Sequence, residues 1–189
     1  MVTIQSDNFS LAQICESGQC FRMTKYSDDR YGLVAFGKYL EMVQTGNSIC
    51  FDCTQEEFDT LWEAYFDLET DYAAIIAGID ANDAYLSAAA EYGRGIRILH
   101  QELWEMLISF LISQNNNIGR IQSSVRALCS RYGERRGTAD GRTYFCFPTP
   151  EALANVSLED LNACGLGYRS RYVSRAADGV CRGDIDLSE

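Results

Sequence analysis

Residues 114–120 of the chain read Gln-Asn-Asn-Asn-Ile-Gly-Arg and lead from one apolar stretch, 101–113, into a second that begins at Ile118 and runs to 132, and both stretches have helical spacing. Asn is unfavourable inside a helix because its side chain competes for backbone hydrogen bonds. Three in succession therefore predict a turn between two helices. A turn that presents carboxamides and then a guanidinium can contact the base edges and phosphates of a nucleic acid.

A second segment of the same character lies nearer the C-terminus. Residues 165–172 read Gly-Leu-Gly-Tyr-Arg-Ser-Arg-Tyr, which predicts a tight turn that carries an aromatic ring and two guanidiniums. Together the two turns supply the groups that insertion into a DNA duplex requires.

The charge of the chain is unevenly distributed. Its net charge is −11, which by itself argues against a nucleic-acid partner. Residues 1–93 hold 16 acidic and 4 basic side chains, whereas residues 94–189 hold 11 acidic and 12 basic ones. An anionic partner is therefore expected to meet the second part. The alternative is ordinary solvated surface charge.

The eight Cys residues allow two interpretations. The N-terminus has no secretion signal, so a disulfide framework and secretion are not expected. Cys50 and Cys53 have metal-ligand spacing and could join Cys15 and Cys20 in a zinc site. Residues 48–53 favour a strand, however, and a strand places the thiols of Cys50 and Cys53 on opposite faces. We therefore expect small buried side chains and no metal. No apolar window is long enough to span a membrane.

The periodicity changes along the chain and predicts an α+β fold. Residues 1–53 favour an antiparallel sheet of four or five strands, with a short helix or irregular crossing at 8–15. A capping box at Thr54–Glu57 begins a helical region in which only 133–147 resembles a loop. We predict an N-terminal sheet domain with covering helices at 1–93 and an all-helical domain at 94–189.

Four motifs in this order resemble the 8-oxoguanine DNA glycosylase/AP lyase family. They are the two turns above, Ser-Gly-Gln-Cys-Phe-Arg at 17–22 and Phe-Pro-Thr-Pro-Glu-Ala-Leu at 147–153. The resemblance runs from about Ile4 to about Cys181. It implies base-excision repair of 8-oxoguanine opposite cytosine in damaged double-stranded DNA, by a monomer without a cofactor. It also implies a location in the cytoplasm or nucleoid, or in the nucleus of a eukaryote.

The resemblance also implies residue roles. Extruding a base costs roughly a few kcal/mol, and the vacated space must be filled. Asn115 would enter that space, Arg120 and Arg169 would donate to the unpaired cytosine, and Tyr168 would wedge beside the stack. The carbonyl of Gly18 would accept the N7 proton that distinguishes 8-oxoguanine from guanine.

Each of these residues has a simpler interpretation. Gly18 could merely end a turn, and Asn115 could cap the following helix. Tyr168 could belong to the core beside Tyr172, and Arg169 and Arg171 could face solvent. Arg171 is left outside the predicted site, and the only histidine, His100, is assigned no chemistry.

The catalytic residues of the family have no counterpart here. The resemblance implies a Lys nucleophile and an assisting Asp, both expected beyond Glu189 together with a helix-hairpin-helix. Lys25 and Lys38, the only lysines, match neither role. We therefore expect an incomplete helical domain, no activity from this chain alone, and aggregation through uncovered apolar faces. The alternatives are a non-catalytic module that binds damaged duplex, and an acidic interaction protein.

Overall fold

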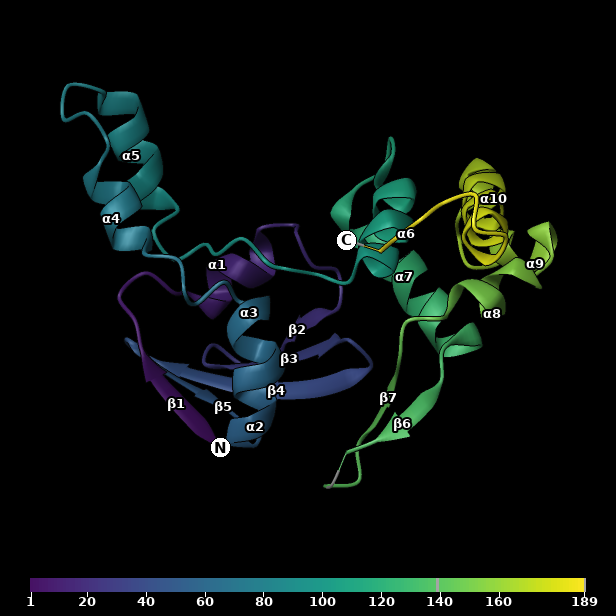
Figure 1. Ribbon diagram of the computed structural model, residues 1–189, viewed down its shortest axis with the longest axis horizontal. Helices are drawn as coiled ribbons and strands as arrows, with labels where there is room; N and C mark the ends of the chain where they lie inside the picture. The colour runs from purple at the N-terminus through teal and green to yellow at the C-terminus, as the bar shows by residue number, and fades with distance from the viewer. Residues whose placement is uncertain (139, 189) are drawn as a thin grey trace. The chain divides into compact units, whose positions relative to one another are not determined.

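The computed structural model describes residues 1–138 and 140–188 and has an antiparallel sheet followed by helices (Figure 1). This confirms the α+β fold class. The chain forms two compact units. The first comprises 1–33 and 40–100, and the second comprises 34–39 and 101–189.

The five-stranded sheet has the order β1-β5-β4-β3-β2. Its strands are β1 (Val2–Gln5), β2 (Met23–Lys25), β3 (Arg30–Ala35), β4 (Lys38–Thr45) and β5 (Ser48–Phe51). Phe51 of β5 is opposite Val2 on one side and Met42 on the other, in antiparallel register. All three of these side chains are buried, so this face of the sheet packs on the core.

An aromatic cluster packs in the core of the first unit. The ring centroids of Phe51 lie 6.3, 5.2 and 5.7 Å from those of Phe9, Phe58 and Phe66. Thr54 caps the next helix by accepting from the Glu57 amide at 3.1 Å, which confirms the Thr54 half of the predicted capping box, while Glu57 Oε1 accepts from Trp62 Nε1 at 3.3 Å. The elements around this cluster are α1 (Leu11–Glu16), α2 (Gln55–Glu57), the π-helical turn η1 (Phe58–Trp62) and α3 (Glu63–Tyr65).

Two further helices of the first unit, α4 (Tyr72–Ala77) and α5 (Ala84–Tyr92), extend away from the sheet (Figure 1). Neither contains a buried residue. Asp71 and Asp83 cap them by accepting from the amides of Ala74 and Leu86.

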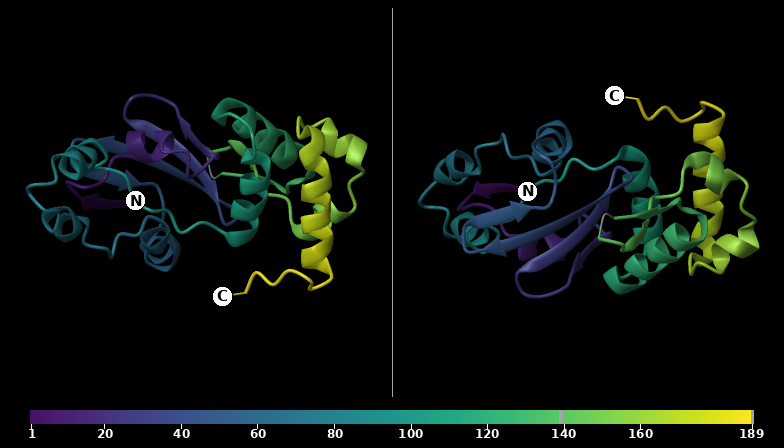
Figure 2. Two further views of the ribbon diagram at one scale, coloured as in Figure 1. Left: turned by 90° about the horizontal axis from the view of Figure 1, so that it is seen from above. Right: turned by 90° about the horizontal axis from the view of Figure 1, so that it is seen from below.

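The second unit is mostly helical. Its core is formed by the apolar faces of α6 (Leu103–Ser113), α7 (Ile118–Tyr132) and α10 (Ser170–Cys181). Two short helices, α8 (Pro150–Ala154) and α9 (Leu158–Asn162), pack against α10, which is yellow in Figure 2. Thr149 and Ser157 cap them through their hydroxyls, as expected of these residues at helix starts.

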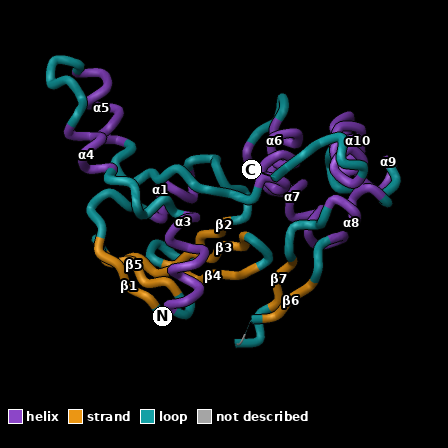
Figure 3. The backbone as a smooth tube through the Cα atoms, viewed as in Figure 1, coloured by secondary structure: helices purple, strands orange, loops and turns teal. Residues whose placement is uncertain are grey.

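The predicted loop at 133–147 is wrong. This segment contains an antiparallel hairpin of β6 (Arg135–Gly137) and β7 (Thr143–Phe145), drawn in orange in Figure 3. Each strand has three residues and all of β6 is exposed, so no alternation of apolar and polar residues marked it. Within the predicted turn at 165–172, Gly167–Arg169 forms the 3-10 turn η2, and α10 begins at Ser170.

The expectation of buried cysteines holds for Cys20, Cys129, Cys146 and Cys164 but is wrong for Cys181, which is exposed, while Cys15, Cys50 and Cys53 are half-buried. Cys50 lies between the buried Ile49 and Phe51 of β5 and is itself half-buried. Burial raises the pKa of the Cys53 thiol to about 11, which disfavours the thiolate that binds metals. Within 1–138 and 140–188, no group of three His, Cys, Asp or Glu side chains is arranged to hold a metal ion. In the same part of the chain, no helix has the length and apolarity to cross a bilayer.

Candidate nucleic-acid interface

The three successive Asn residues between α6 and α7 have three different roles. Asn117 is the N-cap of α7, because its Oδ1 accepts from the Arg120 amide at 3.0 Å. Asn116 donates through Nδ2 to the Ile112 carbonyl at 3.0 Å and so satisfies the end of α6. The side chains of Asn116 and Asn117 therefore form hydrogen bonds that stabilise the turn.

Asn115 is the member of the triplet that remains available. Its φ of +49° is in the left-handed region, which Asn tolerates better than most residues. The side chain is exposed and forms no hydrogen bond with any residue that the structure describes. Capping of α7 belongs to Asn117, so the simpler interpretation of Asn115 as a cap is wrong.

Arg169 joins the second turn to the first. Its Nε and Nη2 donate to the Gln114 carbonyl at 2.7 and 2.6 Å, and Nη2 also donates to the Asn115 carbonyl at 2.7 Å. The side chain is buried, so the interpretation of Arg169 as a solvent-facing residue is wrong. A charged donor on these carbonyls holds the backbone of Asn115 in its left-handed conformation.

The hydrogen-bond capacity of Arg169 is nearly used within the chain. A guanidinium has five N–H donors. Three are accounted for at Gln114 and Asn115, and Nη1 makes a longer contact of 3.4 Å with the Leu166 carbonyl. One N–H of Nη1 therefore remains for an outside acceptor.

Tyr168 is exposed beside this guanidinium. The Arg169 Cζ lies 4.6 Å from its ring centroid, and the Tyr168 hydroxyl donates to the Gln114 carbonyl at 3.3 Å. The ring is 53% exposed and meets Tyr172 edge-on at 6.1 Å. A phenol with more than half its surface in solvent is not a core residue, so that alternative is wrong.

Two glycines shape the second turn. Gly165 and Gly167 have φ of +81° and +58°, which L-residues with side chains rarely adopt. A Cβ at Gly165 would also approach Ser124 Oγ to 3.2 Å. The Gly-Leu-Gly sequence therefore places Tyr168 and Arg169 directly after α9.

Arg120 lies on the first turn of α7 and is exposed. It forms no ion pair with any of residues 1–138 and 140–188. Of the five residues predicted for the site, the structure thus brings four into one region of the second unit, and three of them are joined by direct contacts.

Gly18 belongs to the first unit. It has φ of +78° and follows Ser17, the C-cap of α1, so it lies in the turn after this helix, in agreement with its simpler interpretation. Its carbonyl accepts no hydrogen bond from a described residue. The adjacent Gln19 braces the turn, because its Nε2 donates to the Arg97 carbonyl at 3.0 Å and its Oε1 accepts from the Leu99 amide at 3.1 Å.

The sequence does not predict the hydrogen-bond network around Arg97, which holds in place the segment that Gln19 contacts. Arg97 is buried, and its guanidinium donates to backbone carbonyls at Phe66, Asp67 and Thr70. Its Cζ lies 4.0 Å from the ring centroid of Tyr72. Burial lowers the pKa of Arg97. Arg is usually exposed, and the apolar neighbours Ile96 and Ile98 do not by themselves predict that Arg97 is buried, so only the fold identifies it.

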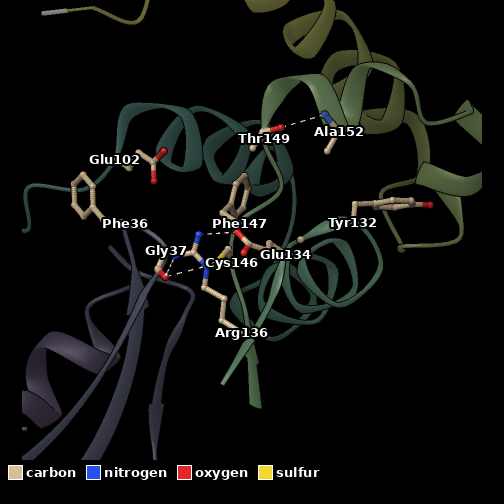
Figure 4. A pocket seen from close by; sticks show the side chains of 11 residues that line it. Phe36, Gly37, Glu102, Tyr132, Glu134, Arg136, Cys146, Phe147, Thr149 and Ala152 are labelled. Carbon is tan, nitrogen blue, oxygen red and sulfur yellow. Dashed lines mark hydrogen bonds and ion pairs between the residues drawn. The ribbon is translucent and has the colours of Figure 1, made fainter. Parts of the chain in front are cut away.

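A separate pocket of about 750 Å³ lies in the second unit (Figure 4). Arg136 crosses it, and its guanidinium donates to the Gly37 carbonyl at 2.9 Å and to Glu134 at 2.6 Å. The aromatic residues of its wall are Phe36, Tyr132 and Phe147. None of the predicted site residues lines this pocket.

Residues 108–181, which contain both turns, match the HhH-GPD superfamily of base excision DNA repair proteins. Residues 1–107 match the N-terminal domain of 8-oxoguanine DNA glycosylase. The chain therefore belongs to the 8-oxoguanine DNA glycosylase family, which confirms the resemblance drawn from the four motifs.

Individual relatives agree with this assignment. The N-glycosylase/DNA lyase of Saccharomyces cerevisiae is 33% identical over 198 residues, covering 93% of this chain and 50% of the yeast protein. The structure of MBOgg1 in complex with a low-affinity DNA ligand has a TM-score of 0.92 and 34% identity, covering 98% of this chain and 64% of that one.

A bacterial complex is similarly close. The 8-oxoguanine glycosylase/lyase of Clostridium acetobutylicum, bound to duplex DNA with cytosine opposite 8-oxoguanine, has a TM-score of 0.90 and 30% identity. The match covers 99% of this chain and 67% of the Clostridium chain. This chain spans about half the length of the yeast relative.

Proposed function

We propose that this chain recognises 8-oxoguanine opposite cytosine in duplex DNA and extrudes the damaged nucleotide, within an N-glycosylase/AP lyase of base-excision repair. Asn115 enters the vacated space, and Tyr168 wedges beside the stack. Arg120 and the remaining N–H of Arg169 donate to the acceptors of the unpaired cytosine. The Gly18 carbonyl accepts the N7 proton of the lesion. The protein acts as a monomer, without a cofactor, wherever chromosomal DNA is located.

The observation that carries this proposal is the bonding of Arg169 to the carbonyls of Gln114 and Asn115. It fixes one turn on the other while leaving the Asn115 carboxamide unbonded and the Tyr168 ring exposed. Groups held rigidly in place lose little entropy when they insert into a duplex. The four residues for which the family resemblance implies DNA contact all belong to the second unit, and two of the related structures are complexes with DNA.

The test is the preference for a damaged duplex. Fluorescence anisotropy would give Kd for a duplex with a stable abasic-site analogue opposite cytosine and for the intact duplex. We expect Asn115→Ala to reduce the ratio of the two affinities by about tenfold, equivalent to about 1.4 kcal/mol. Asn155→Ala is the matched control, because Asn155 is exposed in the same unit and bonds only to the Glu151 carbonyl. A wild-type protein without any preference would refute the proposal.

A second candidate, a module that binds damaged duplex without cleaving it, is favoured by the contacts of Lys25. Its Nζ forms an ion pair with Asp28 at 2.9 Å. An amine engaged by a carboxylate is a poor nucleophile for the Schiff-base step. Borohydride trapping on 8-oxoguanine duplex separates the candidates. A covalent adduct assigns lyase chemistry to this chain, whereas lesion preference without an adduct supports the binding module.

A further inference from the structure

Helix α10 has an apolar side in the core of its unit and a cationic side in solvent. Val173 and Ala177 are fully buried, whereas Arg171, Tyr172 and Arg175 are exposed. Tyr172 meets the ring of Tyr168, so the exposed side continues from the proposed wedge. We call Tyr168, Arg171, Tyr172 and Arg175 the α10 stripe.

The exposed arginines of the second unit fall into two groups, and the arginines of the stripe belong to the group that forms no ion pair with a described residue, together with Arg120, Arg126, Arg131 and Arg135. Arg136, Arg142 and Arg182 lie 2.6, 2.7 and 3.0 Å from the carboxylates of neighbouring acidic residues. Arg171 and Arg175 form no ion pair with any residue the structure describes. This includes Asp178, which lies on the same helix one turn beyond Arg175. Their positive charges are therefore not neutralised within the described chain.

We propose that the α10 stripe binds the sugar–phosphate backbone of the DNA strand that passes Tyr168, with Arg171 and Arg175 each contacting a phosphate. The two arginines are four positions apart in the helix, which corresponds to about 6 Å along its axis. That step equals about two nucleotides of one strand at about 3.4 Å each. Tyr172, between the arginines, offers a hydroxyl that can donate to the same backbone. The inference rests on the proposed function, because it extends the same DNA-binding surface.

The simpler interpretation is that these arginines are ordinary solvated charges. Two features oppose it. The stripe is continuous with Tyr168 rather than scattered over the unit, and it interleaves aromatic rings with guanidiniums. Phosphate contacts position a protein on the duplex without reading its sequence. The stripe should therefore strengthen binding to every duplex equally.

The experiment measures the salt dependence of binding. Arg171→Gln/Arg175→Gln would be compared with wild type on intact and abasic-analogue duplexes between 50 and 200 mM salt. Each lost phosphate contact lowers the slope of log K against log[salt] by about 0.9. We expect the double variant to lower it by about 1.8 on both duplexes and to retain the lesion preference. Arg171→Lys/Arg175→Lys should restore the slope, and Arg182→Gln, whose side chain is paired with Asp184, should not change it.

The outcomes separate this inference from the proposed function. A double variant with the wild-type slope overturns the α10 stripe, whatever the lesion preference is. A wild type that binds both duplexes equally, with a slope that falls in the double variant, refutes lesion recognition but supports the stripe. A wild type that binds neither duplex overturns both. Thermal melts of each variant exclude misfolding as the cause of a change.

Discussion

The contribution of a single side chain to the stability of this protein depends on the hydrogen bonds around it, and Asp67 offers a direct test of this dependence. Burial raises the pKa of this carboxyl, but hydrogen bonds from Tyr72, Thr70 and His100 outweigh burial and lower it overall. Because its pKa is lowered in the folded state, the carboxylate stabilises the fold at pH values above the unfolded pKa of about 3.9. This stabilisation is lost as pH falls through the folded pKa. In thermal melts, we expect Asp67→Asn to be less stable than wild type at pH 6, and the gap to shrink below about pH 4.

Tyr72→Phe is the control for Asp67, because it removes a hydroxyl that donates to the carboxylate at 2.7 Å. It should weaken the acid dependence without abolishing it, and a gap constant from pH 6 to pH 3 would contradict the assignment.

The same scale shows the limit of sequence reasoning. Composition predicts that the Asn triplet forms a turn. Which of the three side chains stays without a hydrogen bond depends instead on the backbone groups at the end of α6 and the start of α7. The donors of Arg169 are likewise directed by tertiary contacts that no local pattern encodes.

Among the elements, α6 has an exposed apolar face that should promote self-association. Met106 and Phe110 are 44% and 62% exposed and lie one helical turn apart. We expect Phe110→Gln to raise the concentration at which light scattering begins, because Gln is a good helix former without apolar surface. Ile108→Ala, at a fully buried position of the same helix, should instead destabilise the fold by about 2–5 kcal/mol. An unchanged onset for Phe110→Gln would exclude this face as the cause.

Elements with strong local signals were predictable, and elements without them were not. Thr54, Thr149 and Ser157 indicate helix starts because each hydroxyl caps the backbone amide three residues further on. The hairpin of β6 and β7 gave no such signal. Its strands are short and mostly exposed, and its contacts with Gly37 and Tyr39 come from residues about a hundred positions earlier in the sequence.

For the whole molecule, we expect the distribution of charge to decide which segments meet DNA. Residues 1–93 carry 16 acidic and 4 basic side chains, so they repel phosphates, whereas the unpaired arginines lie in the second unit. On adding abasic-analogue duplex, we expect slower hydrogen exchange at 114–120 and 166–175, because these segments become enclosed. The α4–α5 hairpin should exchange as before, since it has no buried residue and six Asp or Glu in residues 67–91.

Intact duplex provides the comparison that separates lesion recognition from general binding. The α10 stripe should be protected by both duplexes, because phosphates are common to both. Protection at Asn115 should require the abasic analogue, since only an emptied position in the stack admits its carboxamide. Protection confined to residues 72–92 would show that the acidic part meets the partner, and it would remove the basis for assigning DNA contact to the two turns.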